Sequence, residues 1–445
     1  MADSTRRFQA PKGTRDFYPE EMAFRRHIES TWRAVSIEHG FDEIEGPAFE
    51  HLDLYTVKSG EGIISELFSF TRAGGDVPYA LRPEFTPTLA RMYASRANSL
   101  PVPTKWFAIP THFRAERPQR GRLREHVQWN IDMIGDPSAN ADAEVLATCI
   151  GVLDRFGLSA RDMRVRLSHR DVITLALQNA GVQQPAMQAT FELIDRREKM
   201  GQEAFQEQAM TIGLEASAID RIEALARTTA DASEDPCTIL EAIGVGADAG
   251  EPLRQLQACL EAYGLLDWCT WDFSIVRGLA YYTGMVFEVH EATGSERAVA
   301  GGGRYDNLIE LFGGPPTPAC GFGMGDVVLG LVLKDRCGDS QVDSMPGPDA
   351  FVICDHDDES MLVQRILASL WKHRLHARRS YKSTRNVGKL LADADRCGAR
   401  FTVLVSSDEP EGSVVLRDMQ SKNQESISID QLAGCIRSRL SATGD

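Results

Sequence analysis

The sequence has no long apolar run, no secretory signal and no internal repeat. Its 445 residues contain no run of about 18 or more apolar residues, the length that a membrane-spanning helix requires. The N-terminus MADSTRRFQAPKG lacks an apolar h-region, so we expect no secretory signal, and a short organelle presequence is an open alternative. These absences favour a soluble globular protein with no membrane partner.

Cysteine patterns that mark disulfide frameworks or zinc sites are also missing. The nine cysteines are an odd number spread along the chain, and no two of them form a CxxC pair. We therefore expect a reducing, cytoplasmic compartment and no dedicated metal site. The cysteines that lie among apolar residues, and are expected to be reduced core residues, are Cys149, Cys259, Cys354 and Cys435.

An excess of basic residues is absent as well. The 48 Lys and Arg are outnumbered by 64 Asp and Glu, which gives a net charge of −16. Residues 349–445 hold 14 residues of each sign, so all of the acidic excess lies in residues 1–348. This acidity argues against non-specific nucleic-acid binding, but it permits a local, salt-sensitive contact with RNA.

The chain is too long for one ordinary hydrophobic core. Residues 22–38 predict an amphipathic helix, and residues 141–157 predict a second helix that Gly157 ends. Residues 41–55 predict a strand broken by a Gly-Pro pair. The apolar residues of the first helix, at steps of four, four and three, are Phe24, Ile28, Trp32 and Val35. The short β-rich segments that predict an antiparallel sheet are 65–71, 78–82, 105–110 and 126–135.

Composition changes twice beyond this region. Residues 171–264 are rich in Ala, Leu, Glu and Gln and lose the strand patterns, which predicts a helical insertion within a core of residues 1–170 and 265–337. The polar, Pro- and Gly-rich residues 338–348 predict a linker. Residues 349–445 alternate strands and helices, which predicts a small α/β domain with a mostly parallel sheet. Its expected strands are 350–354, 376–381, 399–406 and 413–419, and its expected helices are 360–373, 386–398 and 429–440.

The segment FRAERPQRGRLREH (113–126) carries five arginines within eleven residues. Pro118 and Gly121 interrupt it, which predicts a strand, a loop and a second strand. Planar guanidinium groups bind phosphates through two hydrogen bonds, so the loop could hold a nucleotide triphosphate. A solvated charged turn is the alternative. The five residues are Arg114, Arg117, Arg120, Arg122 and Arg124.

The segment LRPEFTPTLARM (81–92) fixes a carboxylate between two prolines. Glu84 could bind the ammonium group of a substrate. Alternatively, Glu84 caps a helix that begins near Thr86.

Two later segments are rich in glycine and tyrosine. RGLAYYTGMVFEVH (277–290) has adjacent tyrosines, which face opposite sides of an extended chain, so one can pack while the other lines a pocket. An edge strand with a core tyrosine is the alternative. AGGGRYDNLIELFGG (300–314) has three glycines that let backbone approach a ligand, and a flexible turn is the alternative. No GxxxxGK[ST] phosphate loop occurs.

In this order and spacing, these segments resemble the successive motifs of the histidyl-tRNA synthetases. The resemblance spans nearly the whole chain, and residues 382–405 are similar to the family's anticodon-binding domain. The RGLxYYTG stretch is its most family-specific piece. The matching segments are PKGTRDFYP (11–19), GFDEIEGP (40–47), LRPEFTPTLAR (81–91), FRAERPQRGR with REHVQWNIDMIG (113–135), RGLAYYTGMVFE (277–288), GGGRYDNL (301–308) and GFGMGD (321–326).

The resemblance implies an α/β protein with an α+β core. Its parts would be a class II synthetase antiparallel sheet with flanking helices, a helical insertion and a C-terminal α/β anticodon-binding domain. A homodimer is implied because the first motif, the helix at 22–38 and the strand that ends near Pro47, forms the subunit interface in class II enzymes.

The implied activity is that of a histidine–tRNA ligase. It would activate L-histidine with ATP, which brings Mg²⁺, to give histidyl-adenylate and pyrophosphate, and then transfer histidine to the 3′ end of tRNA(His). Two alternatives are open: a catalytically altered paralogue that regulates ATP phosphoribosyltransferase, and a non-catalytic RNA- or partner-binding module.

The resemblance also implies roles for individual residues. Arg277 and Arg114 would be catalytic, and Arg114 would bind the α-phosphate of ATP. Other ATP-binding residues would be Glu116 on the adenine side, Arg122 at the terminal phosphates, His126 and Arg304. Histidine-binding residues would be Glu84, Thr86, Gln128, Asp132, Arg277, Tyr281, Tyr282 and Tyr305.

Three departures from the family pattern stand out. Gly325-Asp326-Val327-Val328 replaces Gly-hydrophobic-Glu-Arg, so Val328 stands where an ATP-binding arginine is usual. His126 aligns with the aromatic residue that stacks on adenine, and Ala280 replaces an aspartate. Our hypothesis is that the charge missing at Val328 comes from Arg120, Arg122 or Arg304. Candidates for anticodon contacts, chosen by charge alone, are Arg378, Arg379, Lys382, Arg385 and Lys389.

Overall fold

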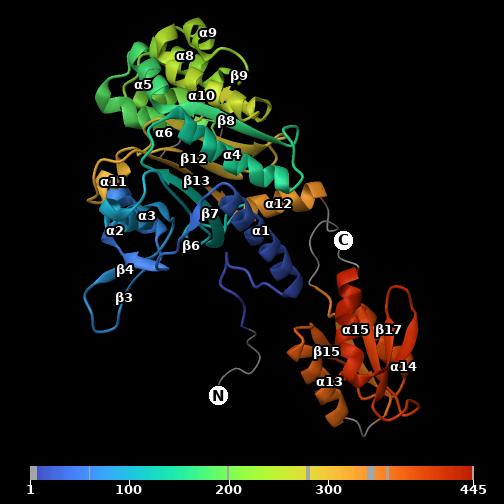
Figure 1. Cartoon of the computed structure of the whole chain (residues 1–445). Coiled ribbons are helices and arrows are strands. Elements are labelled where there is room, and N and C mark those ends of the chain that lie inside the picture. The colour runs from blue at the N-terminus through green and yellow to red at the C-terminus, as the bar shows by residue number, and fades with distance from the viewer. Residues whose placement is uncertain are drawn as a thin grey trace. The chain divides into compact units, whose positions relative to one another are not determined.

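The computed structural model describes residues 8–59, 61–197, 200–276, 281–337, 346–356 and 360–442. The chain divides into two compact units (Figure 1). The first comprises residues 1–18 and 25–341, and the second comprises residues 19–24 and 342–445. No helix in the described ranges is long and apolar enough to cross a membrane.

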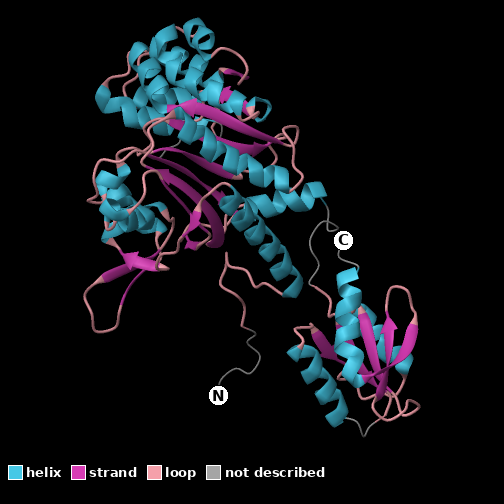
Figure 2. Cartoon of the chain, viewed as in Figure 1, coloured by secondary structure: helices cyan, strands magenta, loops and turns pink. Residues whose placement is uncertain are grey.

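The larger unit is built on a sheet that has ten strands among the residues described, in the order β1-β5-β7-β13-β12-β11-β8-β10-β9, with β6 paired to β7. Neighbours are antiparallel except for β1 with β5 and β8 with β10. Figure 2 shows the sheet covered by helices. The strands are β1 (Asp42–Glu43), β5 (Thr104–Ala108), β6 (Thr111–Phe113), β7 (Glu125–Ile134), β8 (Met163–His169), β9 (Thr229–Asp231), β10 (Cys269–Asp272), β11 (Met285–Glu291), β12 (Ala300–Arg304) and β13 (Ala319–Gly325).

Helix α1 (Pro19–Glu38) packs its apolar stripe against β7, as the steps of three and four residues predict. Trp32 stacks on Trp129 with ring centroids 6.1 Å apart, and the indole N–H of Trp129 donates to Ser36 Oγ over 2.9 Å. Helix α4 (Ala139–Arg155) lies beside α1 and begins at Ser138, whose side chain accepts from the Ala141 N–H. Helix α12 (Asp326–Cys337) follows β13 directly. Helix α1 lies on the face of the sheet that carries Trp129.

A second, three-stranded sheet precedes the arginine-rich segment. Its order is β2 (Phe49–His51), β4 (Pro78–Leu81) and β3 (Ser69–Thr71), and helices α2 (Asp53–Ser59) and α3 (Thr86–Ala94) accompany it. The prediction of one broken strand over 41–55 is wrong. The Gly-Pro pair separates β1 from β2, and Asp53 begins a helix instead of continuing the strand.

Residues 171–264 are mainly helical. The predicted loss of all strand character there is wrong at β9, a three-residue strand that pairs antiparallel with β10. Its sequence, Thr-Ala-Asp, is too short to show a period of two, and the pairing with β10 decides its conformation. The α-helices are α5 (Arg170–Asn179), α6 (Met187–Arg196), α7 (Gln202–Thr211), α8 (Ala216–Arg227), α9 (Pro236–Ala242) and α10 (Glu251–Ala262); a short helix, α11 (Leu308–Leu311), lies later in the chain.

The smaller unit has a mixed sheet in the order β15-β14-β16-β17-β18. The prediction of a mostly parallel sheet is wrong: β14 pairs in parallel with β15 and β16, and the pairs β16–β17 and β17–β18 are antiparallel. Strand β18 was missed because its sequence QESIS is polar and exposed. The elements are β14 (Ala350–Cys354), α13 (Ser360–Lys372), β15 (Ala377–Arg379), α14 (Val387–Arg396), β16 (Phe401–Val405), β17 (Ser413–Asp418), β18 (Gln424–Ser428) and α15 (Ile429–Ala442).

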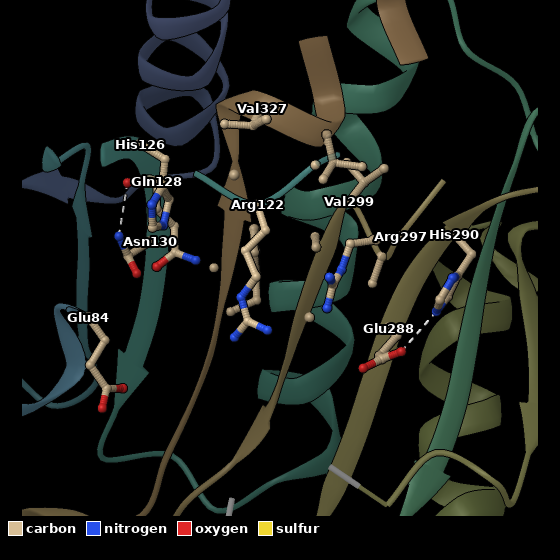
Figure 3. A pocket seen from close by; sticks show the side chains of 18 of the residues that line it. Glu84, Arg122, His126, Gln128, Asn130, Glu288, His290, Arg297, Val299 and Val327 are labelled. Atoms are coloured by element: carbon tan, nitrogen blue, oxygen red, sulfur yellow. Dashed lines mark hydrogen bonds and ion pairs between the residues drawn. The ribbon is translucent and has the colours of Figure 1, made fainter. Parts of the chain in front are cut away.

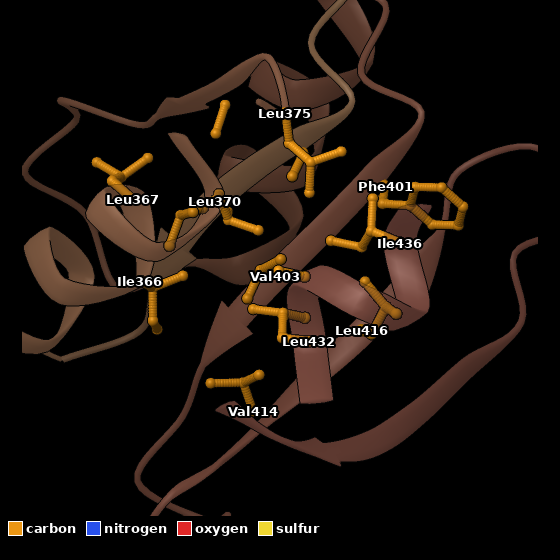
Figure 4. Packing of buried hydrophobic residues seen from close by; sticks show 14 of the residues in the cluster. Ile366, Leu367, Leu370, Leu375, Phe401, Val403, Val414, Leu416, Leu432 and Ile436 are labelled. Carbon is orange, nitrogen blue, oxygen red and sulfur yellow. The ribbon is translucent and has the colours of Figure 1, made fainter. Parts of the chain in front are cut away.

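The core of this unit forms where α13 and α15 cover the sheet. Ile366 and Leu370 of α13 and Leu432 and Ile436 of α15 are buried around Val403 of β16 (Figure 4). The unit therefore has a hydrophobic core of its own.

Candidate functional site

A pocket of about 890 Å³ opens on the face of the large sheet opposite α1. Strand β7 supplies the polar wall of the pocket. Side chains alternate between the two faces of a strand, and every second residue in this part of β7 is polar. Gln128, Asn130 and Asp132 line the pocket, whereas Trp129 and Ile131, between them, are fully buried on the other face. Figure 3 shows Gln128 and Asn130 next to His126 on this wall.

Glycines make the floor of the pocket on β12 and β13. Gly321 pairs with Asp132, and Gly323 pairs with Asn130. A Cβ atom at Gly321 would lie 2.5 Å from Asp132 Oδ1, and one at Gly323 would lie 2.7 Å from Gln128 Cδ. Because these positions carry no Cβ atom, the polar side chains of β7 have space to lie across β13.

The carboxyl of Asp132 is a buried polar group of the pocket. It accepts a hydrogen bond from the Tyr305 hydroxyl, and both residues are buried. Burial raises the pKa of Asp132 to about 7, while the Tyr305 hydrogen bond opposes this rise. The Tyr281 ring packs edge-on against Tyr305 and lies 4.6 Å from the Tyr282 ring. The predicted Asp132 and three tyrosines thus lie together in the pocket.

Glu84 and Thr86 reach the same pocket from the start of α3. The alternative that Glu84 caps this helix is wrong, because the capping position is Phe85 and no side chain caps the helix. In Figure 3 the Glu84 carboxylate points into the pocket.

Arg114 and His126 line the other end of the pocket. Arg114 Nε donates to the Pro83 carbonyl over 3.1 Å. Burial, together with the positive charges of Arg114, Arg15 and Arg122, lowers the pKa of His126 to about 3. His126 is therefore a neutral aromatic ring at physiological pH.

Arg122 lines the pocket, but the predicted nucleotide ligand Glu116 does not. Glu116 forms an ion pair with the Arg122 guanidinium. The carboxylate therefore holds the arginine of the loop in place.

Arg304 does not line the pocket, and its predicted role in binding ATP is wrong. Its guanidinium lies 2.9 Å from Asp142 and 3.2 Å from Asp306, and it donates to the carbonyls of Asp136 and Ser138. Only 5% of Arg304 is exposed. The residue anchors β12 to the start of α4, so no donor is left for a phosphate.

The predicted catalytic Arg277 lies outside the described residues, as does Ala280. The described part of that segment resumes at Tyr281 and continues into β11.

Several pocket residues were missed from the sequence. Glu288 and His290 of β11 are joined by a hydrogen bond of 2.8 Å, and Arg166 of β8 contacts Asp272 at 2.6 Å. The alternation in VFEVHE could have placed Glu288 and His290 on one face. Arg297, in the β11–β12 hairpin, also lines the pocket, and nothing in its local sequence marks it.

Asp326, in the third motif, has a structural role. Its Oδ1 accepts from the Val127 N–H over 2.9 Å, and its Oδ2 accepts from Arg15 Nη2 over 2.6 Å. It thus ties β7 to the N-terminal segment that carries Arg15. Val327 and Val328, which follow it, give the pocket an uncharged wall.

Comparisons with known proteins agree with this geometry. A family model described as Histidyl-tRNA synthetase matches residues 13–325, and one described as Anticodon binding domain matches residues 349–439. A Histidine–tRNA ligase of Opitutus terrae is 36% identical over 437 residues, covering 97% of this chain and 98% of the relative. A chloroplastic/mitochondrial Histidine–tRNA ligase of Arabidopsis thaliana is 35% identical, covering 95% of this chain and 85% of the relative.

Two solved structures share the fold. The histidyl-tRNA synthetase from Nostoc sp. PCC 7120 has a TM-score of 0.76 at 23% identity, covering 97% of this chain and 99% of that chain. The ATP phosphoribosyltransferase regulatory subunit/histidyl-tRNA synthetase from Bacillus halodurans has a TM-score of 0.71 at 22% identity. The match covers 90% of this chain and 99% of that chain. Because structure is conserved further than sequence, identities this low show the fold alone.

Proposed function

This chain belongs to the histidyl-tRNA synthetase family and is a histidine–tRNA ligase, and we propose that the pocket over β7, β12 and β13 is where it activates histidine. Histidine–tRNA ligases join L-histidine to ATP, release pyrophosphate and pass histidine to the 3′ end of tRNA(His). The observation that carries the proposal is the buried pair of Asp132 and Tyr305 above Gly321.

In our proposal the histidine imidazole binds at Asp132, with Tyr281, Tyr282 and Tyr305 around the ring. An imidazole has two ring nitrogens, and a site with buried hydrogen-bonding groups rejects amino acids that leave those groups unpaired. Gln128 completes this end of the pocket. Glu84 and Thr86, at the start of α3, bind the substrate ammonium group. This arrangement is supported by the burial of Asp132 and by the shared pocket wall.

ATP occupies the other end of the pocket in this proposal. Adenine stacks on the neutral ring of His126, Arg114 binds the α-phosphate, and Arg122, held by Glu116, reaches the terminal phosphates. Magnesium enters with ATP and is held largely by phosphate oxygens. We retain Arg277 as a second catalytic arginine on the basis of the sequence.

The chemistry requires two anions to meet. The histidine carboxylate attacks the α-phosphorus of ATP, a P–O bond forms, and pyrophosphate leaves with the electrons of the broken bond. Guanidinium groups reduce the repulsion between carboxylate and phosphate and stabilise the charge of the transition state. The rest of the site aligns the reactants.

A Tyr305→Phe variant tests the histidine end of the pocket. Loss of the hydroxyl removes the partner of Asp132, so we expect KM for histidine to rise about tenfold in ATP–pyrophosphate exchange, with KM for ATP unchanged. Unchanged constants for both substrates would refute the assignment. Wild-type protein that folds but shows no exchange with histidine would favour the regulatory-subunit alternative.

We propose that residues 1–170 and 265–337 form the catalytic core, that 171–264 are an insertion and that 349–445 read tRNA(His). The C-terminal unit has a cavity of about 690 Å³ lined by Trp371, Arg379 and Tyr381. Aromatic and arginine side chains of this kind stack on unpaired bases. Residues 338–348 would be the linker.

We also propose that two copies of this chain form a homodimer. The three-stranded sheet exposes Phe49 and Phe70, whose rings lie 5.7 Å apart and pack on Tyr79. Exposed aromatic clusters of this kind mark contact surfaces. Sedimentation of a Phe49→Glu/Phe70→Glu variant is expected to show a monomer where wild type sediments as a dimer.

A reducing, cytoplasmic compartment is our proposal for the location. Eight cysteines in the described ranges are free thiols, and Cys149 among them is fully buried. Cys259, Cys354 and Cys435, expected in the core, are only partly buried.

A further inference from the structure

The hairpin between β11 and β12 places an arginine at the pocket that the proposed function leaves without a role. Arg297 is exposed, lines the pocket and points into it together with Arg122 (Figure 3). It arises from a different element than the arginine-rich loop, so its position depends on how the hairpin is held.

An ion pair joins the hairpin to the arginine-rich loop, and Gly121 of the loop lies close to Arg297. Arg120 Nε donates to Glu296 Oε1 over 2.8 Å. A Cβ atom at Gly121 would lie 3.5 Å from Arg297 Cδ and 3.3 Å from Val328 Cγ2. The Arg297 side chain therefore runs along the tip of the loop, beside the uncharged wall at Val328.

The other arginines of the pocket have partners. Arg122 pairs with Glu116, Arg166 pairs with Asp272, and Arg114 donates to the Pro83 carbonyl. In the part of the chain that the structure describes, no carboxylate or carbonyl is bonded to the Arg297 side chain. A guanidinium that is not bonded to a carboxylate or carbonyl of the protein can donate all five of its N–H groups to a bound anionic ligand.

A triphosphate is the anion that the pocket must accept. In the proposed site its terminal phosphates extend away from the reacting α-phosphate, toward Arg122, which lines the pocket. Neither Arg120 nor Arg304 lines the pocket: Arg120 is paired with Glu296, and Arg304 is buried among acidic and carbonyl oxygens. Arg297 lines the pocket near Arg122, is exposed and carries a positive charge, as a ligand of the terminal phosphates must.

We propose that Arg297 binds the terminal phosphates of ATP together with Arg122 and supplies the positive charge that Val328 does not. This inference rests on the proposed ATP site. It makes Arg297 a substrate-binding residue contributed by the β11–β12 hairpin, and it makes the Arg120–Glu296 pair the contact that positions it.

Comparing the affinities of the protein for ATP and for AMP separates a phosphate-binding role of Arg297 from a structural one. AMP lacks the β- and γ-phosphates but keeps the adenine and α-phosphate contacts. Equilibrium dialysis with wild type, Arg297→Ala and Arg297→Lys is expected to show an ATP affinity about 10- to 100-fold weaker in the alanine variant and intermediate in the lysine variant. AMP affinity should stay within about twofold in all of them, because the lost contacts are ionic and local.

Arg254→Ala is the matched control, because Arg254 is an exposed arginine of the helical insertion that does not line the pocket. It should bind both nucleotides as wild type does. Equal ATP affinity in wild type and Arg297→Ala, or an equal loss for ATP and AMP, would overturn the proposal. The proposed function is judged separately: wild type that binds ATP through Arg297 but does not exchange pyrophosphate with histidine would refute the function and leave the Arg297 site intact.

Discussion

Burial keeps the imidazole of His126 neutral, so that the residue has the character of an uncharged aromatic ring. Its pKa of about 3 keeps the ring neutral, and its Nδ1 is buried with no hydrogen-bond partner among the described residues. Replacing the ring with phenylalanine therefore removes no hydrogen bond at Nδ1.

We expect His126→Phe to keep KM for ATP within about threefold of wild type between pH 6 and 9. His126→Ala should raise KM about tenfold or more, because base–aromatic stacking contributes roughly 1–3 kcal/mol. Initial rates of pyrophosphate exchange at varied ATP give both values. A phenylalanine variant as impaired as the alanine variant would show that His126 binds through a nitrogen instead.

Asp132 carries a stability cost that depends on pH. Its pKa is raised from 3.8 to about 7 in the folded protein, so the unfolded chain ionises first as pH rises. Stability contributed by this group is present below about pH 4 and is lost between pH 4 and 7, at about 1.4 kcal/mol per pH unit. In our proposal this carboxylate binds the substrate, and its burial lowers the stability of the fold above about pH 4.

Asp132→Asn is therefore expected to stabilise the ligand-free protein relative to wild type more strongly at pH 8.5 than at pH 5.5, by roughly 2 kcal/mol. Thermal denaturation of both proteins at the two pH values measures this difference. A stability gain that does not change with pH would mean that Asp132 does not titrate in this range.

The residues of the site were predictable in part. The order of the motifs correctly indicated that Asp132, Tyr305, Glu84 and Gln128 would share a pocket, although they are far apart in sequence. The prediction for Arg304 was wrong because a guanidinium suits a phosphate and a pair of carboxylates, here Asp142 and Asp306, equally well, and sequence alone does not say which is nearby. Arg297 was missed because an isolated arginine in a hairpin has no sequence pattern.

At the scale of elements, the glycine-rich strands β12 and β13 are required by the site. A Cβ atom at Gly321 would lie 2.3 Å from the Ile131 carbonyl oxygen and 2.5 Å from Asp132 Oδ1. Contacts this short force the backbone or the buried carboxyl to move.

We expect Gly321→Ala to lower the free energy of unfolding by about 1–3 kcal/mol, the usual cost of overpacking. Gly325→Ala is the matched control on the same strand, because no atom lies within 4 Å of its added Cβ. Its stability should stay within about 0.5 kcal/mol of wild type in denaturant unfolding. Equal effects at both positions would contradict the packing account.

The elements predicted best were those with strong periodicity. Helix α1 and strand β14 follow their apolar patterns closely. Strands β9 and β18 were missed because three residues in β9 and a polar edge sequence in β18 carry no periodic signal. Pairing with a neighbouring strand decides their conformation.

At the scale of the whole molecule, activation and tRNA reading are assigned to different units. Tyr381 is 82% exposed, and the Arg379 guanidinium lies 4.5 Å from its ring centroid. Both residues line the cavity of the C-terminal unit and are far in sequence from the activation pocket.

Tyr381→Ala should therefore lower kcat/KM for tRNA(His) in aminoacylation about tenfold and leave ATP–pyrophosphate exchange unchanged. Met361→Ala, which removes another exposed apolar side chain of the same unit, should change neither activity. Loss of exchange together with aminoacylation would show that Tyr381 acts on folding or on the other unit.

The central claim is that the pocket over the glycine strands activates histidine. The most direct test is ATP–pyrophosphate exchange by the wild-type chain, measured separately with each of the twenty amino acids. The account predicts exchange with histidine alone, because other amino acids would leave the buried hydrogen-bonding groups of Asp132 and Tyr305 without a substrate partner. Folded protein that exchanges with no amino acid, or with several equally, would contradict it.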